Sequence, residues 1–176
     1  MVLTGPEIHR HVGAGNIVIE PFDPARLNPN SFDISLGNTL LRYTQLPIDP
    51  RIETTVEEIE IPAQGLTLER GEFVLGSSQE VIGSPHFVPL IHAKSSIARA
   101  GLFVHVTADL IDIGSVGTVT FQLYPTLPLK VFPGMLIGQV SFWRPLGEIE
   151  LYKGKYQNST GPRKSMIFMD PFWGGK

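Results

Sequence analysis

The chain has 176 residues, a formal net charge of −3 at pH 7 and no cysteine. This length suits one domain with its own core, and the negative charge gives no general attraction to nucleic acid or an anionic membrane. The lack of cysteine excludes disulfides, a thiolate nucleophile and a cysteine-ligated zinc site. No apolar run approaches the roughly 18 residues of a membrane span, and the first residues do not follow a signal-peptide pattern. We expect a soluble cytoplasmic protein with no membrane or nucleic acid partner.

The predicted elements begin with one helix. Thr4 and Glu7 fit a capping box, and a helix over 7–12 would end at Gly13 and Gly15. After it, short segments rich in β-branched or aromatic residues and bounded by Gly, Pro or Asn predict strands. These segments are 16–20, 31–36, 39–43, 56–61, 72–75, 87–91, 118–124, 129–132 and 136–142.

The turns and the end of the chain complete the predicted architecture. The 15 prolines and 18 glycines suit a mainly β fold, a distorted β-barrel or jelly roll, and argue against a helical bundle. We expect one domain over 1–176. The segment 153–176 is polar, basic and glycine-rich, and it is predicted to be a tail that crosses the surface or a neighbouring subunit.

The stretch 94–112 surrounds an apolar run with charges, hydroxyls and a carboxylate. Lys94, Ser95, Ser96 and Arg99 bring two cations and two hydroxyls close together, and Ser95 is a good N-cap for a short turn that would attract an anion. The stretch lies between two apolar segments, where a polar turn favours a site rim. From spacing alone, a phosphate cradle and a solvated turn with an incidental basic pair both stay open.

The histidines are candidates for metal binding. His9 and His11 are two residues apart on the predicted helix and would face different directions. His86, His92 and His105 stand alone, without a carboxylate at a recognised ligand spacing. We expect no metal site, and we expect His105 to be a half-buried strand residue whose ring is satisfied by a backbone partner.

The run 94–112 resembles the signature of the dCTP deaminases, the deaminating branch of the dUTPase-like superfamily. Three further segments agree with it, namely Asn30 to Asn38, Pro133 to Gly138 and Gly154 to Gln157. The resemblance implies a distorted β-barrel that assembles as a homotrimer, with each nucleotide site shared between subunits. It also implies zinc-free deamination of dCTP to dUTP and ammonia, in agreement with the absence of cysteine.

Roles for individual residues follow from the resemblance, position by position. Lys94, Ser95, Ser96 and Arg99 would contact the triphosphate or the catalytic water, and the backbone around Ala108 would help to hold that water. Mg²⁺ would enter on the triphosphate and not as a catalytic metal. The residues implied for the rest of the substrate are Asp112 at the deoxyribose, Thr120, Phe121 and Gln122 beside the pyrimidine, and Tyr152 and Lys155 in the tail over the phosphates.

Gln122 stands where the family has a glutamate that acts as general base and general acid. A carboxamide has no usable basicity near neutral pH, and loss of a positioned acid/base typically costs about 10²- to 10⁴-fold in rate. Further differences surround the same pocket and together favour natural divergence over a single deliberate change. They fall at His92, Ala93, Leu110, Ile113 and Ser115, and in the short loop 125–127.

Three functions therefore stay open at this stage. The first is a dCTP deaminase, with Gln122, Ser95, Arg99 and Ala108 at the reacting centre. The second is a phosphohydrolase of the dUTPase type, in which Asp112 is the general base and Gln122 positions a group without ionising. The third is a nucleotide-binding or regulatory protein that keeps the fold and the trimer without catalysis.

Overall fold

The structure, a computed structural model, describes residues 1–105 and 107–173. It contains two α-helices, α1 (Gly5–Gly13) and α2 (Ser95–Arg99), and three 3₁₀ turns, η1 (Pro24–Arg26), η2 (Ile167–Met169) and η3 (Pro171–Trp173). The strands are β1 (Val18–Glu20), β2 (Phe32–Ser35), β3 (Thr39–Tyr43), β4 (Val56–Glu60), β5 (Leu66–Leu68), β6 (Val74–Gly83), β7 (Val88–Ala93), β8 (Leu102–Phe103), β9 (Val116–Pro125), β10 (Leu129–Val131) and β11 (Leu136–Trp143).

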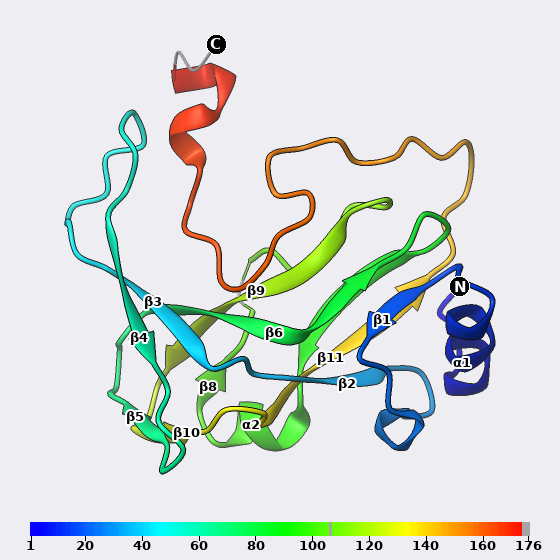
Figure 1. The fold of residues 1–176 in the computed structure, drawn as a ribbon, viewed down its shortest axis with the longest axis horizontal. Helices are drawn as coiled ribbons and strands as arrows, with labels where there is room; N and C mark the ends of the chain where they lie inside the picture. Colours follow the sequence, from blue (N-terminus) through cyan, green and yellow to red (C-terminus); the bar gives the residue numbers. More distant parts are fainter. Residues whose placement is uncertain (106, 174–176) are drawn as a thin grey trace.

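The described strands form three antiparallel sheets (Figure 1). The largest has the order β4-β3-β6-β9-β8, with β1 paired to the far part of β6. A second sheet has the order β2-β11-β7, and β10 and β5 form a small third one. The mainly β fold with a short N-terminal helix is therefore confirmed.

The core lies between the two larger sheets. Phe121 from β9 and Phe32 and Phe142 from the β2-β11-β7 sheet are fully buried in one apolar cluster. Ile8 of α1 is also fully buried in this cluster, so the helix covers one end of the core (Figure 1). Burial of such side chains is the main favourable term that holds the sheets together.

Helix α1 begins earlier than predicted and without a capping box. Thr4 occupies the N-cap position, but its side chain makes no capping hydrogen bond. Glu7 instead accepts a hydrogen bond from the guanidinium of Arg10 at 2.7 Å, one turn further along. The predicted capping box is therefore wrong. Pro6 lies in the first turn of the helix, where the missing N–H of proline costs no intrahelical hydrogen bond.

Strand β6 extends beyond the predicted segment 72–75 to Gly83. A β-bulge interrupts its apolar alternation, so the sequence pattern does not indicate the second half of the strand. Its pairing with β9 shifts register between Ser77 and Val81. At the shift, the Ser78 hydroxyl accepts a hydrogen bond from the Val119 N–H at 2.8 Å and donates one to the Glu80 carbonyl at 2.6 Å. The bulge turns the Glu80 side chain, which is fully buried, toward β2.

The Glu80 carboxylate lies in a compact polar network. One of its oxygens accepts from Arg26 Nη1 at 2.5 Å and from the Ser35 hydroxyl at 2.6 Å, and the other accepts from the Ser35 N–H at 2.9 Å. A buried carboxylate is tolerated only when it is paired in this way. The network joins η1, β2 and the β6 bulge.

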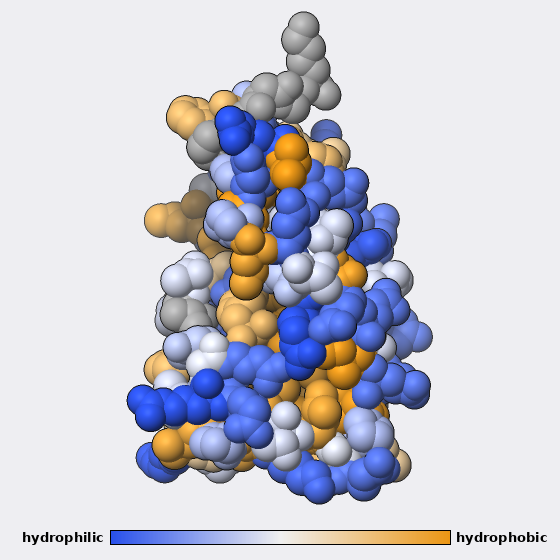
Figure 2. All heavy atoms as spheres, turned by 90° about the vertical axis from the view of Figure 1, so that its left-hand side faces the viewer, coloured by the Kyte–Doolittle hydropathy of each residue, from blue (hydrophilic) through white to orange (hydrophobic). Residues whose placement is uncertain are grey.

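Apolar and polar residues are intermixed on the face of the molecule that carries β3 to β5 (Figure 2). Several large apolar side chains near the ends of β6, β8 and β9 keep substantial exposure, among them Phe73, Phe103, Tyr124 and Leu127. Among the described residues, no helix is both long and apolar enough to cross a bilayer.

Candidate functional site

A cavity of about 460 Å³ opens beside one face of β9. This volume lies within the range of small-molecule sites. Its walls come from β6 and β9, from the segment after β8, and from the tail that follows β11. The polar and aromatic lining residues are Tyr43, Phe73, His105, Asp112, Ser115, Thr118, Thr120, Gln122, Tyr152, Tyr156, Ser159, Arg163, Lys164 and Ser165.

The alternation of β9 produces the floor of this pocket. Phe121 and Leu123 are fully buried in the core and Val119 is buried at its border with the cavity, whereas Thr120 and Gln122 are half-buried and line the cavity. Successive side chains of a strand point to opposite faces. The predicted role of the Phe121 side chain at the pyrimidine is therefore corrected, because that side chain faces the core.

The tail forms the opposite wall by running along β9. The Thr118 N–H donates to the Ser159 carbonyl at 2.9 Å, and the Asn158 N–H donates to the Val116 carbonyl at 2.9 Å. Gly117 permits this approach, since a Cβ atom there would meet the Ser159 backbone nitrogen at 2.7 Å. The tail is thus held as an added segment at the edge of the strand.

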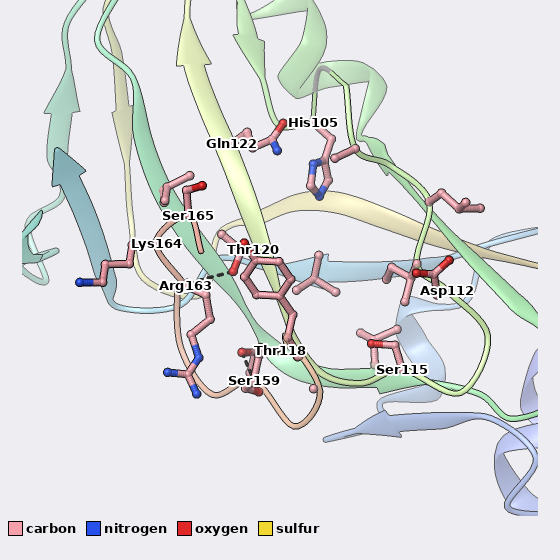
Figure 3. A pocket seen from close by; sticks show the side chains of 18 of the residues that line it. His105, Asp112, Ser115, Thr118, Thr120, Gln122, Ser159, Arg163, Lys164 and Ser165 are labelled. Atoms are coloured by element: carbon pink, nitrogen blue, oxygen red, sulfur yellow. Dashed lines mark hydrogen bonds between the residues drawn. The ribbon is translucent and has the colours of Figure 1, made fainter. Parts of the chain in front are cut away.

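Further along, the tail brings two cations to the pocket. The Arg163 N–H donates to the Thr120 hydroxyl at 3.0 Å (Figure 3). Lys164 donates to the Thr54 carbonyl at 2.9 Å and pairs with Glu53 at 2.8 Å. Sequence reasoning missed both cations; the basic character of the tail was the available signal, but nothing in the pattern showed which tail residues would reach β9.

The segment after β8 forms a third wall. The Ile91 N–H donates to the Asp109 carbonyl at 2.9 Å, and the Ile111 N–H donates to the Pro89 carbonyl at 3.0 Å. These bonds fix the segment on the edge of β7, so that Asp112 lines the pocket on the side away from Gln122 (Figure 3).

His105 also lines the pocket, next to Gln122 (Figure 3). Both of its ring nitrogens are buried, and neither has a hydrogen-bond partner among the described residues. The expectation of a backbone-satisfied ring is therefore wrong. Burial lowers the pKa of His105 below its ordinary value, while Asp109 and Gln122 oppose part of that shift, so the ring is neutral near pH 7.

Five of the residues implied by the sequence resemblance meet in this pocket. They are Ala108, Asp112, Thr120, Gln122 and Tyr152. The pocket thus combines the Asp112 carboxylate, Arg163 of the tail, and amide and hydroxyl groups on β9, while the ammonium of Lys164 is bound by Thr54 and Glu53. Such a mixture can bind a ligand that carries a base, hydroxyl groups and phosphates.

The basic and hydroxyl residues of the 94–99 run lie elsewhere. No described residue of this run lines the pocket; Ser95, Ser96 and Arg99 are exposed on α2, and Lys94 pairs with Asp33. Lys94, and not Ser95, is the N-cap of α2, which corrects the predicted cap. Within one chain, the predicted phosphate cradle and the pocket are separate.

Lys155 is also placed differently from its predicted role. Its ammonium donates to the Met166 carbonyl at 3.0 Å and pairs with Asp170. Both contacts lie within the tail, so in this arrangement Lys155 stabilises the tail and does not line the cavity. No group of three or more His, Asp or Glu side chains is gathered for a metal in the described part of the chain.

Comparison with known proteins places this fold in a family. Residues 2–145 match the family described as dCTP deaminase-like. The chain belongs to the dCTP deaminase-like family. Proteins named "dCTP deaminase, dUMP-forming" from Clostridium botulinum (strain Eklund 17B / Type B) and Cytophaga hutchinsonii are 41% and 42% identical over 171 residues, which is 97% of this chain and 98% of each relative.

A solved structure supports the fold of the family independently. It is a 2'-deoxycytidine 5'-triphosphate deaminase from Agrobacterium tumefaciens, with a TM-score of 0.65 and 22% sequence identity. The similarity covers 80% of this chain and 47% of that one, so the chain spans about half the length of that structure. At this identity the similarity bears on the fold alone.

Proposed function

We propose that this chain binds a pyrimidine deoxynucleoside triphosphate, with Mg²⁺ on its phosphates, in the pocket beside β9 and deaminates dCTP to dUTP and ammonia. The observation that carries the proposal is the pocket itself, in which Asp112, Thr120, Gln122 and Tyr152 meet in a chain of the dCTP deaminase-like family. The family's zinc-free chemistry fits a chain without cysteine.

The lining groups match the parts of such a nucleotide. The carboxamide of Gln122 offers a donor and an acceptor side by side, which complements the ring nitrogen N3 and the amino group of cytosine. The Asp112 carboxylate is an acceptor for a sugar hydroxyl. Arg163 supplies positive charge near the pocket floor, and arginine suits phosphate oxygens because it forms bidentate charge-assisted bonds.

The separation of α2 from the pocket supports assembly as a homotrimer in which Arg99 of one subunit completes a neighbour's site. Exposed apolar side chains such as Phe103 and Leu127 provide surface for such contacts. We expect light scattering at micromolar concentration to give three times the mass of one chain. A stable monomer at that concentration would contradict both the assembly and the shared site.

Nucleotide binding is expected to raise the melting temperature. A ligand that binds only the folded state stabilises it by about 2.7 kcal/mol at 100 times its Kd, so Mg²⁺ with dCTP or dUTP should produce a clear shift and the nucleosides without phosphates little. Arg99→Ala should remove most of this shift, whereas Arg70→Ala, at an exposed position outside the proposed site, should not. An unchanged shift in Arg99→Ala would remove Arg99 from the site.

A second activity of the same pocket is favoured by two observations. The relatives are named dUMP-forming, and formation of dUMP from dCTP requires loss of phosphates as well as of the amino group. Asp112, which lines the pocket, is the carboxylate that would activate water for this step. Asp112→Asn should then abolish pyrophosphate release from dUTP. If the wild-type chain binds the nucleotide but releases neither ammonia nor pyrophosphate, the non-catalytic alternative holds.

A further inference from the structure

The pairing of β8 with β9 brings His105 close to Gln122. Leu102 lies opposite Pro125 and Phe103 opposite Tyr124, and the Gln122 N–H donates to the Val104 carbonyl at 3.0 Å. This bond departs by one residue from the register of the two β8–β9 pairs, and it brings His105, the residue after Val104, beside Gln122. Figure 3 shows the two side chains next to each other, and Gln122 acts on the pKa of His105.

No hydrogen bond of ordinary geometry to a described residue occupies the imidazole, which interacts with the Gln122 side chain beside it. Its two nitrogens are buried and lack partners in the described structure, although buried polar groups are normally hydrogen-bonded. Phe121 packs edge-on against the ring at 6.1 Å between centroids, which holds its orientation. An orphaned, oriented ring that faces a ligand pocket is a candidate for contact with the ligand or with a water bound beside it.

The other titratable groups that face the pocket are less suited to accept a proton next to Gln122. The lining tyrosines, Tyr43, Tyr152 and Tyr156, offer hydroxyl groups, which serve as hydrogen-bond donors and acceptors. Asp112 lies on the other side of the cavity (Figure 3). The side chains of Arg163 and Lys164 are cations.

We propose that His105 is the general base and acid of the deamination, in place of the carboxylate that position 122 lacks. This inference rests on the proposed function. The neutral ring takes one proton from water as the water oxygen bonds to C4 of cytosine. The ring passes that proton to N3, then takes the second proton from the C4 hydroxyl and gives it to the amino nitrogen, so that the C4–N bond breaks and ammonia leaves. Of the two water protons, one ends on ammonia and the other on N3 of the uracil product.

Gln122 is a positioning residue in this scheme. Its carboxamide cannot transfer the proton, but it can hold N3 and the amino group so that C4 faces the water beside His105. The neutral state of His105 near pH 7, caused by burial, leaves one ring nitrogen with a free lone pair. Asp109 opposes the shift and stabilises the imidazolium formed after proton transfer.

The test measures ammonia release from Mg²⁺-dCTP in single turnovers. His105→Asn should lower the rate constant by at least about 100-fold, the lower end for loss of a positioned acid/base, and should keep the thermal shift with dCTP, which shows that the pocket is intact. His86→Asn, at an exposed histidine, should keep the rate. Adding Gln122→Glu to His105→Asn should restore ammonia release, because the new carboxylate at position 122 can transfer the protons in place of the imidazole.

The pH dependence gives a second readout. A base must be unprotonated, so the wild-type rate should stay constant from pH 8 to 7 and fall as pH drops through the lowered pKa of His105. The charged group that acts on the ring is Asp109, in addition to the polar Gln122, whereas Asp112, the tyrosines and Arg163 line other parts of the pocket. Asp109→Asn should move the acidic limb to still lower pH, because removing the carboxylate further disfavours the imidazolium.

The outcomes separate this inference from the proposed function. Wild-type turnover of dCTP that His105→Asn leaves unchanged overturns the role of His105 and keeps the deaminase. An acidic limb that Asp109→Asn does not move also overturns that role. A wild-type protein that releases no ammonia from dCTP overturns both proposals.

Discussion

Gln122→Glu should raise ammonia release from dCTP by about 100-fold. The change places a carboxylate on the pocket face of β9, beside His105, where it can take a proton from water and return it to the leaving nitrogen. The expected gain lies at the lower end of the usual range for a positioned acid/base, because in the wild type His105 already acts as general base and acid. Single-turnover measurement of ammonia from both proteins gives the ratio.

Two controls define what that ratio means. Gln122→Asn shortens the side chain without adding a carboxylate and should not increase the rate. If the site were instead a phosphohydrolase, Gln122→Glu should leave pyrophosphate release unchanged or reduce it, since it adds negative charge beside the substrate. The absence of any gain in ammonia would show that more than this one position separates the chain from the deaminases it resembles.

Arg26→Met should destabilise the fold by about 3 kcal/mol. The change leaves the fully buried Glu80 carboxylate without its only cationic partner in the described network, while Ser35 still donates to it. Removing one partner of a buried pair costs roughly 3–5 kcal/mol, and the lower end applies because the Arg26 side chain is 27% exposed. Urea unfolding measures the loss as a lower midpoint at unchanged slope.

The matched control breaks a surface pair. Arg10→Met removes the exposed bond to Glu7 and should change stability by less than about 1 kcal/mol, as exposed ion pairs usually do. Adding Glu80→Gln to Arg26→Met should recover part of the loss, because the uncompensated charge disappears. A cost below 1 kcal/mol for Arg26→Met would mean that the carboxylate is satisfied without the arginine.

Local patterns predicted most of the sheet structure because most strands are short, β-branched and bounded by turn residues. The predicted strand over 39–43 has the bounds of β3, and the segments 118–124 and 136–142 lie within β9 and β11. Strand β6 was truncated in the prediction because its second half, after the polar Ser77 to Glu80 bulge, does not continue the apolar alternation. The short strands β5 and β8 offer too few residues for any period to show.

The site was harder to predict because it depends on contacts between distant segments. Thr120, Gln122 and Asp112 were reached through the family resemblance, and they do meet in the pocket. The position of His105 beside Gln122 depends on the pairing of β8 with β9 and on the bond from the Gln122 N–H to the Val104 carbonyl, which local sequence does not specify. Arg163 joins the site through tail hydrogen bonds that likewise have no local signal.

Deamination of dCTP in the pocket is tested most simply by following both products in one reaction. Wild-type protein at its assembled concentration is incubated with Mg²⁺ and dCTP, and in parallel with dUTP, while ammonia and pyrophosphate are quantified separately. We expect ammonia from dCTP, at a rate that falls below neutral pH as His105 becomes protonated. Tight binding of dCTP with no ammonia released at any pH would contradict this expectation.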